Sequence, residues 1–169
     1  YSRYDIGLVN PPLRITCSSE RVELVALNAR GTALLPMLLP VVSGTSALMD
    51  LHVADDVIRA RVRPALAPDN EEERSRSASV FDLLRALVAH LGHAGDGLLG
   101  LYGAFGYGLG FRFEPVRAQL PQPLGARDLV LYQPDELVFL DAQEGRAERV
   151  TYDLTMDTAT TRGLARPAL

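Results

Sequence analysis

The sequence predicts an α+β fold built from antiparallel β-sheets with a few packed helices. Several short segments alternate apolar and polar residues and are rich in β-branched side chains, which is typical of strands. One segment, Val80–Leu91, repeats its apolar residues with the period of an α-helix. Because the strands come in runs and do not alternate with helices, the pattern favours antiparallel sheets.

Two hairpins are expected in the first half of the chain. Leu13–Cys17 and Arg21–Leu27 alternate and are predicted to pair across residues 18–20. Met49–Val53 and Val57–Val62 are predicted to form a second hairpin across residues 54–56.

The segment between the hairpins predicts a turn and a short helix. Asn28–Gly31 has turn residues. A helix over Ala33–Leu39 is expected to be disturbed by Pro36 and to end at Pro40. The proline- and acid-rich residues 64–78 predict a solvated loop, or one that shields a neighbouring domain.

The helix over Val80–Leu91 has clear start and stop signals. Ser79 and Asp82 predict a capping box, in which the serine and the acid bond each other's backbone amides. Gly92 is expected just past the helix end.

Residues Gly100–Val116 hold five glycines and five aromatic residues. Glycines between aromatic residues indicate close backbone approach or bends, and the segment is expected to be a strand that bends into a short helix. A proline-rich crossing over residues 115–127 is expected to follow. The next strands are predicted to form a meander with a turn at Ala142–Gly145: Leu129–Tyr132, Leu137–Leu140 and Arg149–Tyr152.

Composition excludes several classes of protein. The net charge is −4 and the 17 basic residues, all arginine, are scattered, so we expect no nucleic-acid partner. No apolar run is long enough to span a membrane. Cys17 stands alone in an alternating run, which favours a packed thiol and a cytoplasmic protein. Because the chain starts at Tyr1 without a methionine, we expect it to be a fragment.

No catalytic constellation is found, and we expect neither catalytic residues nor a metal site. His90 and His93 lie three apart without an obvious third ligand, so a zinc site is disfavoured. Asp135 and Glu136 are expected in a turn between two strands. Glu114 is expected to cap a turn or to form an interdomain ion pair.

The order of several segments resembles the N-terminal region of the large subunit of anthranilate synthase, and especially the bacterial form fused to its glutamine amidotransferase. The resemblance covers about residues 1–153. Its segments are Tyr1–Asp5, Val9–Leu13, Val25–Gly31, Glu71–Arg76, Ser79–Phe81, Leu84–Leu87, Gly100–Tyr107, Phe111–Arg117 and Arg127–Glu136.

The resemblance implies an N-terminal domain over residues 1–153 and a linker or disordered end over residues 154–169. It implies a regulatory and structural role in a lyase that makes anthranilate and pyruvate from chorismate and glutamine or ammonia, for tryptophan biosynthesis. Mg²⁺ and chorismate are then bound by a C-terminal domain that this chain lacks. That domain, a glutamine amidotransferase domain or subunit, and tryptophan as an effector are the implied partners.

Tyr1, Ser2, Arg3 and Tyr4 are the candidates that the resemblance gives for a tryptophan feedback site. An arginine or a tyrosine suits the carboxylate or the ring of an amino acid. Gly108 departs from the family, in which an aspartate is usual. The alternatives are the same region of aminodeoxychorismate synthase or of a phenazine-pathway chorismate enzyme, and a stand-alone binding module without catalysis.

Overall fold

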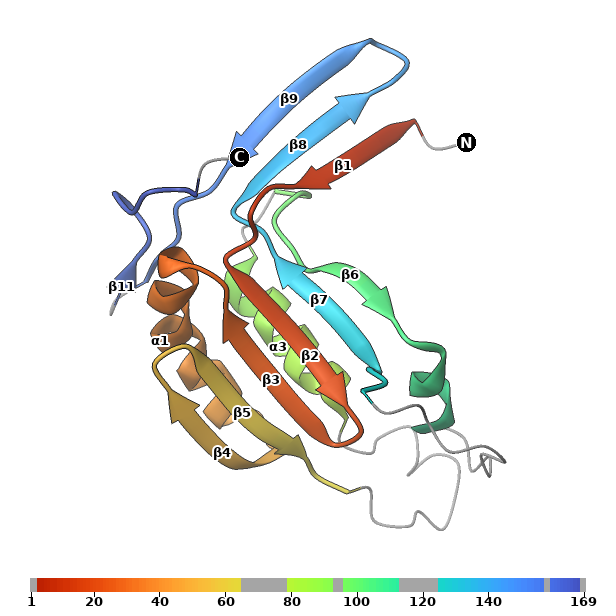
Figure 1. The fold of residues 1–169 in the computed structure, drawn as a ribbon, viewed down its shortest axis with the longest axis vertical. Coiled ribbons are helices and arrows are strands. Elements are labelled where there is room, and N and C mark those ends of the chain that lie inside the picture. Colours follow the sequence, from red (N-terminus) through yellow and green to blue (C-terminus); the bar gives the residue numbers. More distant parts are fainter. Residues whose placement is uncertain (1–2, 65–78, 93–95, 113–124, 157–158, 168–169) are drawn as a thin grey trace.

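The computed structural model describes residues 3–64, 79–92, 96–112, 125–156 and 159–167. Within these ranges the fold is α+β, as predicted, with antiparallel strands and two helices. The chain forms a main sheet covered by helices and a second, smaller sheet that extends away from it (Figure 1).

The main sheet has six antiparallel strands in the order β4-β5-β3-β2-β7-β6. Both predicted hairpins are confirmed, since β2 pairs with β3 and β4 pairs with β5. The strands are β2 (Leu13–Ser18), β3 (Arg21–Ala26), β4 (Leu48–Ala54), β5 (Val57–Val62), β6 (Tyr102–Phe105) and β7 (Leu129–Gln133).

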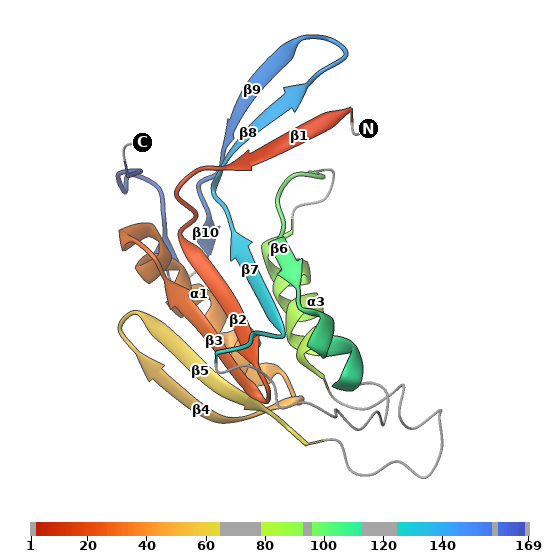
Figure 2. The ribbon, with the colours of Figure 1, turned by 45° about the vertical axis from the view of Figure 1, so that its right-hand side comes forward.

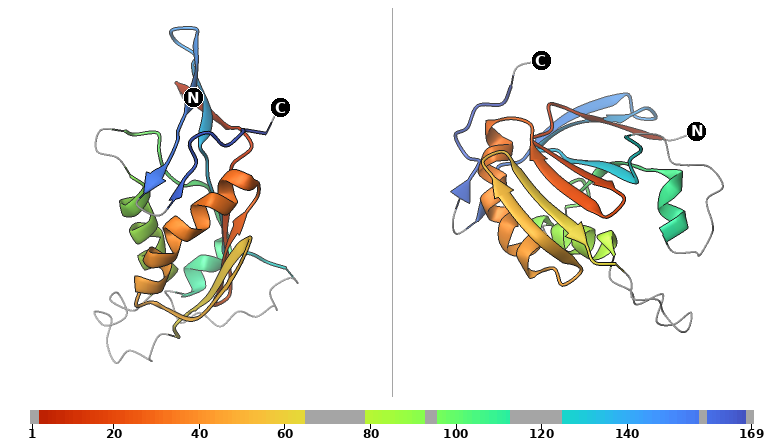
Figure 3. Two further views of the ribbon diagram at one scale, coloured as in Figure 1. Left: turned by 90° about the vertical axis from the view of Figure 1, so that its left-hand side faces the viewer. Right: turned by 60° about the horizontal axis from the view of Figure 1, so that its bottom comes forward.

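The two helices, α1 (Ala29–Gly44) and α3 (Val80–Leu91), lie side by side on one face of this sheet (Figure 3). Alternate residues of the central strand β2 point into the core between these layers, where Leu13, Ile15 and Cys17 are at most 1% exposed. The Cys17 thiol donates to the backbone oxygen of Ser19 at 3.4 Å, so the packing role predicted for this cysteine is confirmed.

The predicted turn at Asn28–Gly31 is wrong, because Asn28 is the N-cap of α1. Its side-chain oxygen accepts from the amides of Arg30 and Gly31 at 3.0 and 3.1 Å. Asparagine serves turns and N-caps alike, so the residue type alone did not separate them. The helix also runs through Pro36 and Pro40, beyond the predicted bounds, because its buried apolar face packs on the sheet and outweighs the lost backbone bonds.

Helix α3 agrees with its prediction. The capping box is present, and the Ser79 amide donates to the Asp82 carboxylate at 2.8 Å. Gly92 ends the helix, but its φ of −66° is not the left-handed conformation that favours glycine at a helix end.

The glycine- and aromatic-rich segment forms strand β6 followed by a short 3₁₀ helix, η1 (Tyr107–Arg112), as predicted. Gly103 has φ +158°, and a Cβ there would lie 2.1 Å from the Val130 oxygen. Only glycine allows so close an approach of β6 to β7. Residues 113–116 of the segment lie outside the described residues, as does most of the predicted crossing over 115–127 and of the loop over 64–78.

The predicted meander is confirmed for its last two strands, which pair antiparallel across the predicted turn at Ala142–Gly145, and is wrong for its first strand, which lies in another sheet. Strand β7 belongs to the main sheet, whereas β8 (Glu136–Asp141) and β9 (Arg146–Thr151) form a second sheet with β1 (Tyr4–Leu8). The order β1-β8-β9 is antiparallel throughout. We call these three strands the projecting sheet, because they extend beyond the helices (Figures 1 and 2).

Part of the segment 154–169, for which a linker or a disordered end is expected, lies within the described residues. It contains the small hairpin of β10 (Thr155–Met156) and β11 (Ala159–Thr160), which lies against α1. Thr161 follows and is fully buried.

Candidate functional site

Two polar arrangements stand out among the described residues. One lies at the outer end of the projecting sheet and contains Arg3 and Tyr4, two of the four candidates for a feedback site. The other is a buried cluster around Arg30, where the chain crosses between the two sheets. Tyr1 and Ser2, the remaining candidates, lie outside the described residues.

Arg3 is held by two carboxylates at the turn between β8 and β9. Its Nε lies 3.0 Å and its Nη2 2.6 Å from Oδ2 of Asp141, and Nη2 lies 3.2 Å from Oε1 of Glu144. The hydrogen bond to Asp141 raises the pKa of Arg3, and the same bond lowers the pKa of Asp141. The guanidinium expected to bind an effector's carboxylate is therefore already bound by carboxylates of its own chain.

Tyr4 combines with its neighbours to form an aromatic surface beside this ion pair. Its ring centroid lies 5.0 Å from that of Phe139, and the Arg3 guanidinium carbon lies 4.8 Å from the Tyr4 centroid. A cation over a ring and a second ring beside it can hold a flat aromatic ligand. The structure thus brings Arg3 and Tyr4 together on one exposed surface.

Arg30 lies in the first turn of α1 and is 1% exposed. Its Nε donates to Oδ2 of Asp135, whose side chain is 4% exposed, and its Nη2 donates to Oδ1 of Asp153 at 2.9 Å. A buried guanidinium without carboxylate partners would be strongly destabilising, so the ion pairs with Asp135 and Asp153 stabilise Arg30 in its buried position.

The same guanidinium also binds backbone oxygens in the C-terminal part of the chain. It donates to the backbone oxygens of Tyr152, Thr161 and Leu164 at 3.0, 2.8 and 3.0 Å. Burial alone would lower the pKa of Arg30, but the hydrogen bonds to Asp135 and Asp153 outweigh burial and raise it. The hydrogen bond from Arg30 lowers the pKa of Asp153.

This cluster lies beside the two chain segments that connect the projecting sheet to the main sheet, one between β1 and β2 and the other between β7 and β8. Asp135 separates β7 of the main sheet from β8 of the projecting sheet, and its backbone oxygen accepts from the Tyr152 amide at 2.8 Å. The Val9 amide, between β1 and β2, donates to the Glu136 oxygen at 3.0 Å. Arg30 therefore fixes the projecting sheet to the helix-covered body.

Tyr152 extends this network toward β6. Its hydroxyl donates to Oδ1 of Asp96 at 3.0 Å, and Asp96 also accepts from the amides of Leu98 and Leu99. Burial, together with the hydrogen bond to Asp96, raises the pKa of Tyr152 to about 12. The tyrosine is thus a neutral hydrogen-bond donor at ordinary pH.

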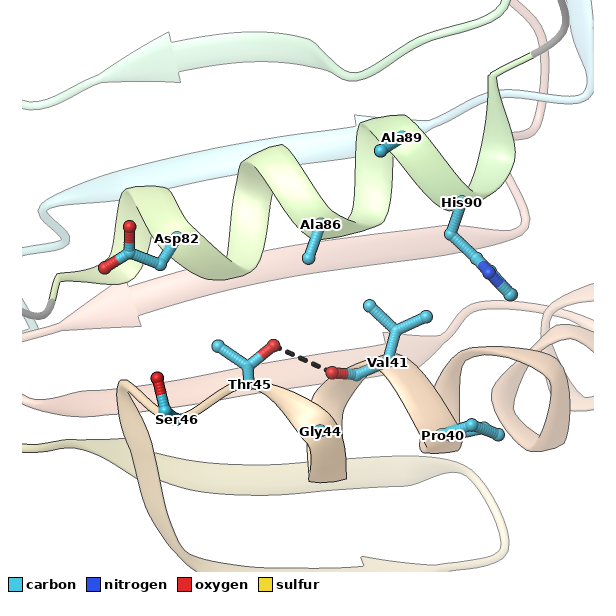
Figure 4. A pocket seen from close by; sticks show the side chains of 9 residues that line it. All are labelled: Pro40, Val41, Gly44, Thr45, Ser46, Asp82, Ala86, Ala89 and His90. Carbon is cyan, nitrogen blue, oxygen red and sulfur yellow. Dashed lines mark hydrogen bonds between the residues drawn. The ribbon is translucent and has the colours of Figure 1, made fainter.

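A shallow groove runs between α1 and α3 (Figure 4). Among the described residues that line it, the only acid and base are Asp82 and His90, which lie two turns apart on α3, or about 12 Å at the rise of an α-helix. Asp82 caps its own helix, and the His90 ring lies 3.1 Å from the Met37 oxygen. The groove therefore does not combine an acid and a base in one site.

The donor set of the described residues does not fit Mg²⁺. No group of three or more histidine, cysteine, aspartate or glutamate side chains that could hold a metal ion occurs in them. The buried carboxylates of Asp135 and Asp141 are bound by Arg30 and Arg3, whereas Mg²⁺ needs oxygens arranged around an octahedron. No helix in these ranges is long and apolar enough to cross a membrane.

Sequence reasoning missed Arg30 and Asp135. Asp135 and Glu136 were expected in a turn between two strands, but both are buried, at 3% and 2% exposed, and Glu136 is the first residue of β8. No spacing in the sequence pairs Arg30 with a residue 105 positions away. The one available signal was an acid directly between two apolar strands, which is costly to bury without a cation.

Over the described residues, the fold and these contacts define an α+β domain with a main sheet and a projecting sheet, and its buried charges stabilise this architecture. No known family profile matches the chain. The chain is 42% identical to an anthranilate synthase of Azospirillum brasilense over 165 residues, which are 97% of the chain and 22% of that protein. It is 34% identical to anthranilate synthase component 1 of Vibrio cholerae over 80% of the chain and 26% of that protein.

A third relative is the pyocyanine-specific anthranilate synthase component 1 of Pseudomonas aeruginosa, 30% identical over 83% of the chain and 26% of that protein. The chain thus spans about a fifth to a quarter of the length of these relatives. It is a homologue of one portion of anthranilate synthase.

Proposed function

We propose that this chain is the N-terminal regulatory and structural part of an anthranilate synthase, a cytoplasmic lyase that makes anthranilate and pyruvate from chorismate and glutamine or ammonia. The observation that carries the proposal is the 42% identity to an anthranilate synthase over 97% of the chain. Identity at this level over almost the whole chain supports a shared role and not only a shared fold.

The chemistry is assigned to the part of such an enzyme that this chain does not span. The proposed partners are a C-terminal domain that binds chorismate and Mg²⁺, and a glutamine amidotransferase domain or subunit. The pairing of the buried acids with arginines supports this division, because these acids are committed to the fold.

Feedback control by tryptophan is the proposed regulatory role. The surface of Arg3 and Tyr4 has the cation and the ring that an aromatic amino acid would contact. Because Asp141 and Glu144 already occupy Arg3, an incoming carboxylate must share or displace them.

Complementation of a tryptophan-requiring bacterium that lacks anthranilate synthase tests this proposal. The complete reading frame that contains these residues should restore growth without tryptophan, and the 169-residue chain alone should not. Failure of the complete reading frame, when supplied with an amidotransferase, would refute the assignment.

The regulatory part is tested separately by enzyme inhibition. Arg3→Ala in the complete enzyme should raise the tryptophan concentration that halves activity. Arg59→Ala is the matched control, because Arg59 pairs with Glu23 on the polar face of the main sheet. Unchanged inhibition in Arg3→Ala would exclude Arg3 from the feedback site.

A further inference from the structure

Residues 161–167 lie beside the base of the projecting sheet, and we call this segment the strap. Asn10, between β1 and β2, donates from its side-chain amide to the Pro167 oxygen at 3.2 Å. Nε of Arg166 lies 3.7 Å from Oε2 of Glu136, the first residue of β8. The strap therefore contacts the chain at both connections between the projecting sheet and the main sheet.

Arg30 of α1 and Arg166 of the strap converge on the same two acceptors. Nη2 of each arginine donates to the Tyr152 oxygen, at 3.0 Å for Arg30 and 2.7 Å for Arg166. Nη2 of each also donates to Oδ1 of Asp153, at 2.9 and 3.3 Å. Because Arg30 also donates to two backbone oxygens of the strap itself, the strap is fixed to α1 through this guanidinium.

Acids and arginines alternate through the cluster that holds the strap. In order of contact, its members are Asp135, Arg30, Asp153, Arg166, Glu136 and Arg149. Ion pairs that are buried or partly buried are screened by salt much less than exposed pairs. Removing one arginine leaves a carboxylate with one partner fewer, so the attachment of the strap should weaken when a single arginine is lost.

The projecting sheet joins the main sheet through short connections. Within the described ranges its strands pair with each other and not with the main sheet, and residues 9–12 and 134–135 connect the two sheets (Figure 1). Asn10 in the first connection has φ 40°, in the left-handed region that bends the chain. Since a few residues between rigid elements can absorb a hinge motion, the angle between the sheets depends on what holds these connections.

We propose that the strap fixes the angle between the two sheets, with Arg30 and Arg166 as its positioning residues. This angle carries the feedback signal from the surface of Arg3 and Tyr4 to the remaining polypeptide, a step that rests on the proposed function. There the chain is an N-terminal part, so the strap leads into the rest of the enzyme. An effector can inhibit through the sheet only if it binds more tightly at one angle than at another.

Double electron–electron resonance tests the strap in the 169-residue chain. Spin labels are attached through Gln143→Cys, in the exposed turn between β8 and β9, and Asp55→Cys, in the exposed turn between β4 and β5. Cys17 is 1% exposed and should stay unlabelled. The distance distribution between the labels should be narrow in the otherwise unchanged chain and severalfold broader in Arg166→Met.

Arg162→Met is the matched control, because Arg162 is an exposed arginine of the same strap outside the cluster. It should leave the distribution narrow, whereas Arg30→Met should broaden it. Far-UV circular dichroism checks that each variant keeps its fold. The side chain of Arg166 is 25% exposed and that of Arg30 only 1%, so Arg166→Met still decides the question if Arg30→Met does not fold.

Enzyme inhibition and effector binding test the feedback step in the complete polypeptide. Arg166→Met should raise severalfold the tryptophan concentration that halves anthranilate formation, while kcat and the KM for chorismate without tryptophan stay at their wild-type values. Equilibrium dialysis with labelled tryptophan should show that the variant still binds it. A merely structural role of Arg166 would not separate tryptophan binding from inhibition.

Three results would overturn the proposal. A distance distribution in Arg166→Met as narrow as in Arg162→Met would refute the strap. A broader distribution with unchanged inhibition would refute the feedback step, as would loss of tryptophan binding together with inhibition. A complete wild-type polypeptide that makes no anthranilate refutes the proposed function and the feedback step with it, whereas the distance measurement decides the strap independently.

Discussion

Replacing Arg30 by methionine is the sharpest test of what holds the two sheets together. The change keeps an extended apolar side chain but removes the cation from a site in which Arg30 is 1% and Asp135 4% exposed. Breaking a buried ion pair from one side costs about 3–5 kcal/mol, because the other charge is left without a partner. Three backbone oxygens lose their donor as well.

The expected loss is therefore about 3–5 kcal/mol in the free energy of unfolding, a large share of the 5–15 kcal/mol typical of a domain. Urea unfolding followed by far-UV circular dichroism measures it, since the chain has no tryptophan. The double variant Arg30→Met/Asp135→Leu removes both charges and should be more stable than Arg30→Met alone.

An exposed pair gives the control for this measurement. Arg59 and Glu23 are 48% and 31% exposed, so Arg59→Met should cost less than about 1 kcal/mol. A cost below about 1 kcal/mol for Arg30→Met, or a double variant no more stable than the single one, would refute the reasoning.

Three further outcomes follow from single positions. Gly31→Ala should strongly destabilise the chain in thermal unfolding, because a Cβ there would lie 2.0 Å from a backbone oxygen, whereas Gly44→Ala, with no atom within 4 Å, should be neutral or stabilising. Because the pKa of Asp141 is lowered in the fold, the ionised carboxylate stabilises the folded chain at pH values above the ordinary pKa of 3.8, and this stabilisation is lost as the pH falls through the lowered pKa. Arg3→Met removes the partner of Asp141, so the variant should lose less stability than wild type on acidification below about pH 4. The pKa of Tyr152 is raised from 10.0 to about 12, so the stability that the protonated Tyr152 contributes to the fold is present below pH 10 and disappears as the pH rises through about 12. Phenolate absorbance should show a late-titrating tyrosine that Tyr152→Phe removes. Normal titration of all tyrosines would contradict this.

Local patterns were enough to predict the elements whose determinants lie close together in the chain. The stripe of Val80–Leu91 and the Ser79 cap are contained within one helix, and the two hairpins join neighbouring segments. The bend from β6 into η1 also followed from its own glycines. In each case the sequence window contains both partners of the contact.

Assignments that depend on distant contacts failed for the same physical reason. The meander prediction assumed that all three consecutive strands pair, but β7 lies between β2 and β6, whereas β8 lies between β1 and β9. The short helix predicted at Ala33–Leu39 is longer because tertiary packing compensates for Pro36 and Pro40. Neither effect has a local signature.

The candidate site was predicted only by resemblance. Arg3 and Tyr4 carry no motif of their own, and their carboxylate and aromatic neighbours, Asp141 and Phe139, come from a strand more than 130 residues away. The structure adds the neighbours that determine what this surface can bind. A role in tryptophan binding stays a prediction.

The product formed from chorismate tests the proposed function most directly. The complete polypeptide is incubated with chorismate, ammonia and Mg²⁺, and the products are identified by mass spectrometry, beside the 169-residue chain alone. We expect anthranilate and pyruvate from the complete polypeptide and neither from the chain alone. Aminodeoxychorismate as the product, or anthranilate made by these 169 residues by themselves, would contradict the account.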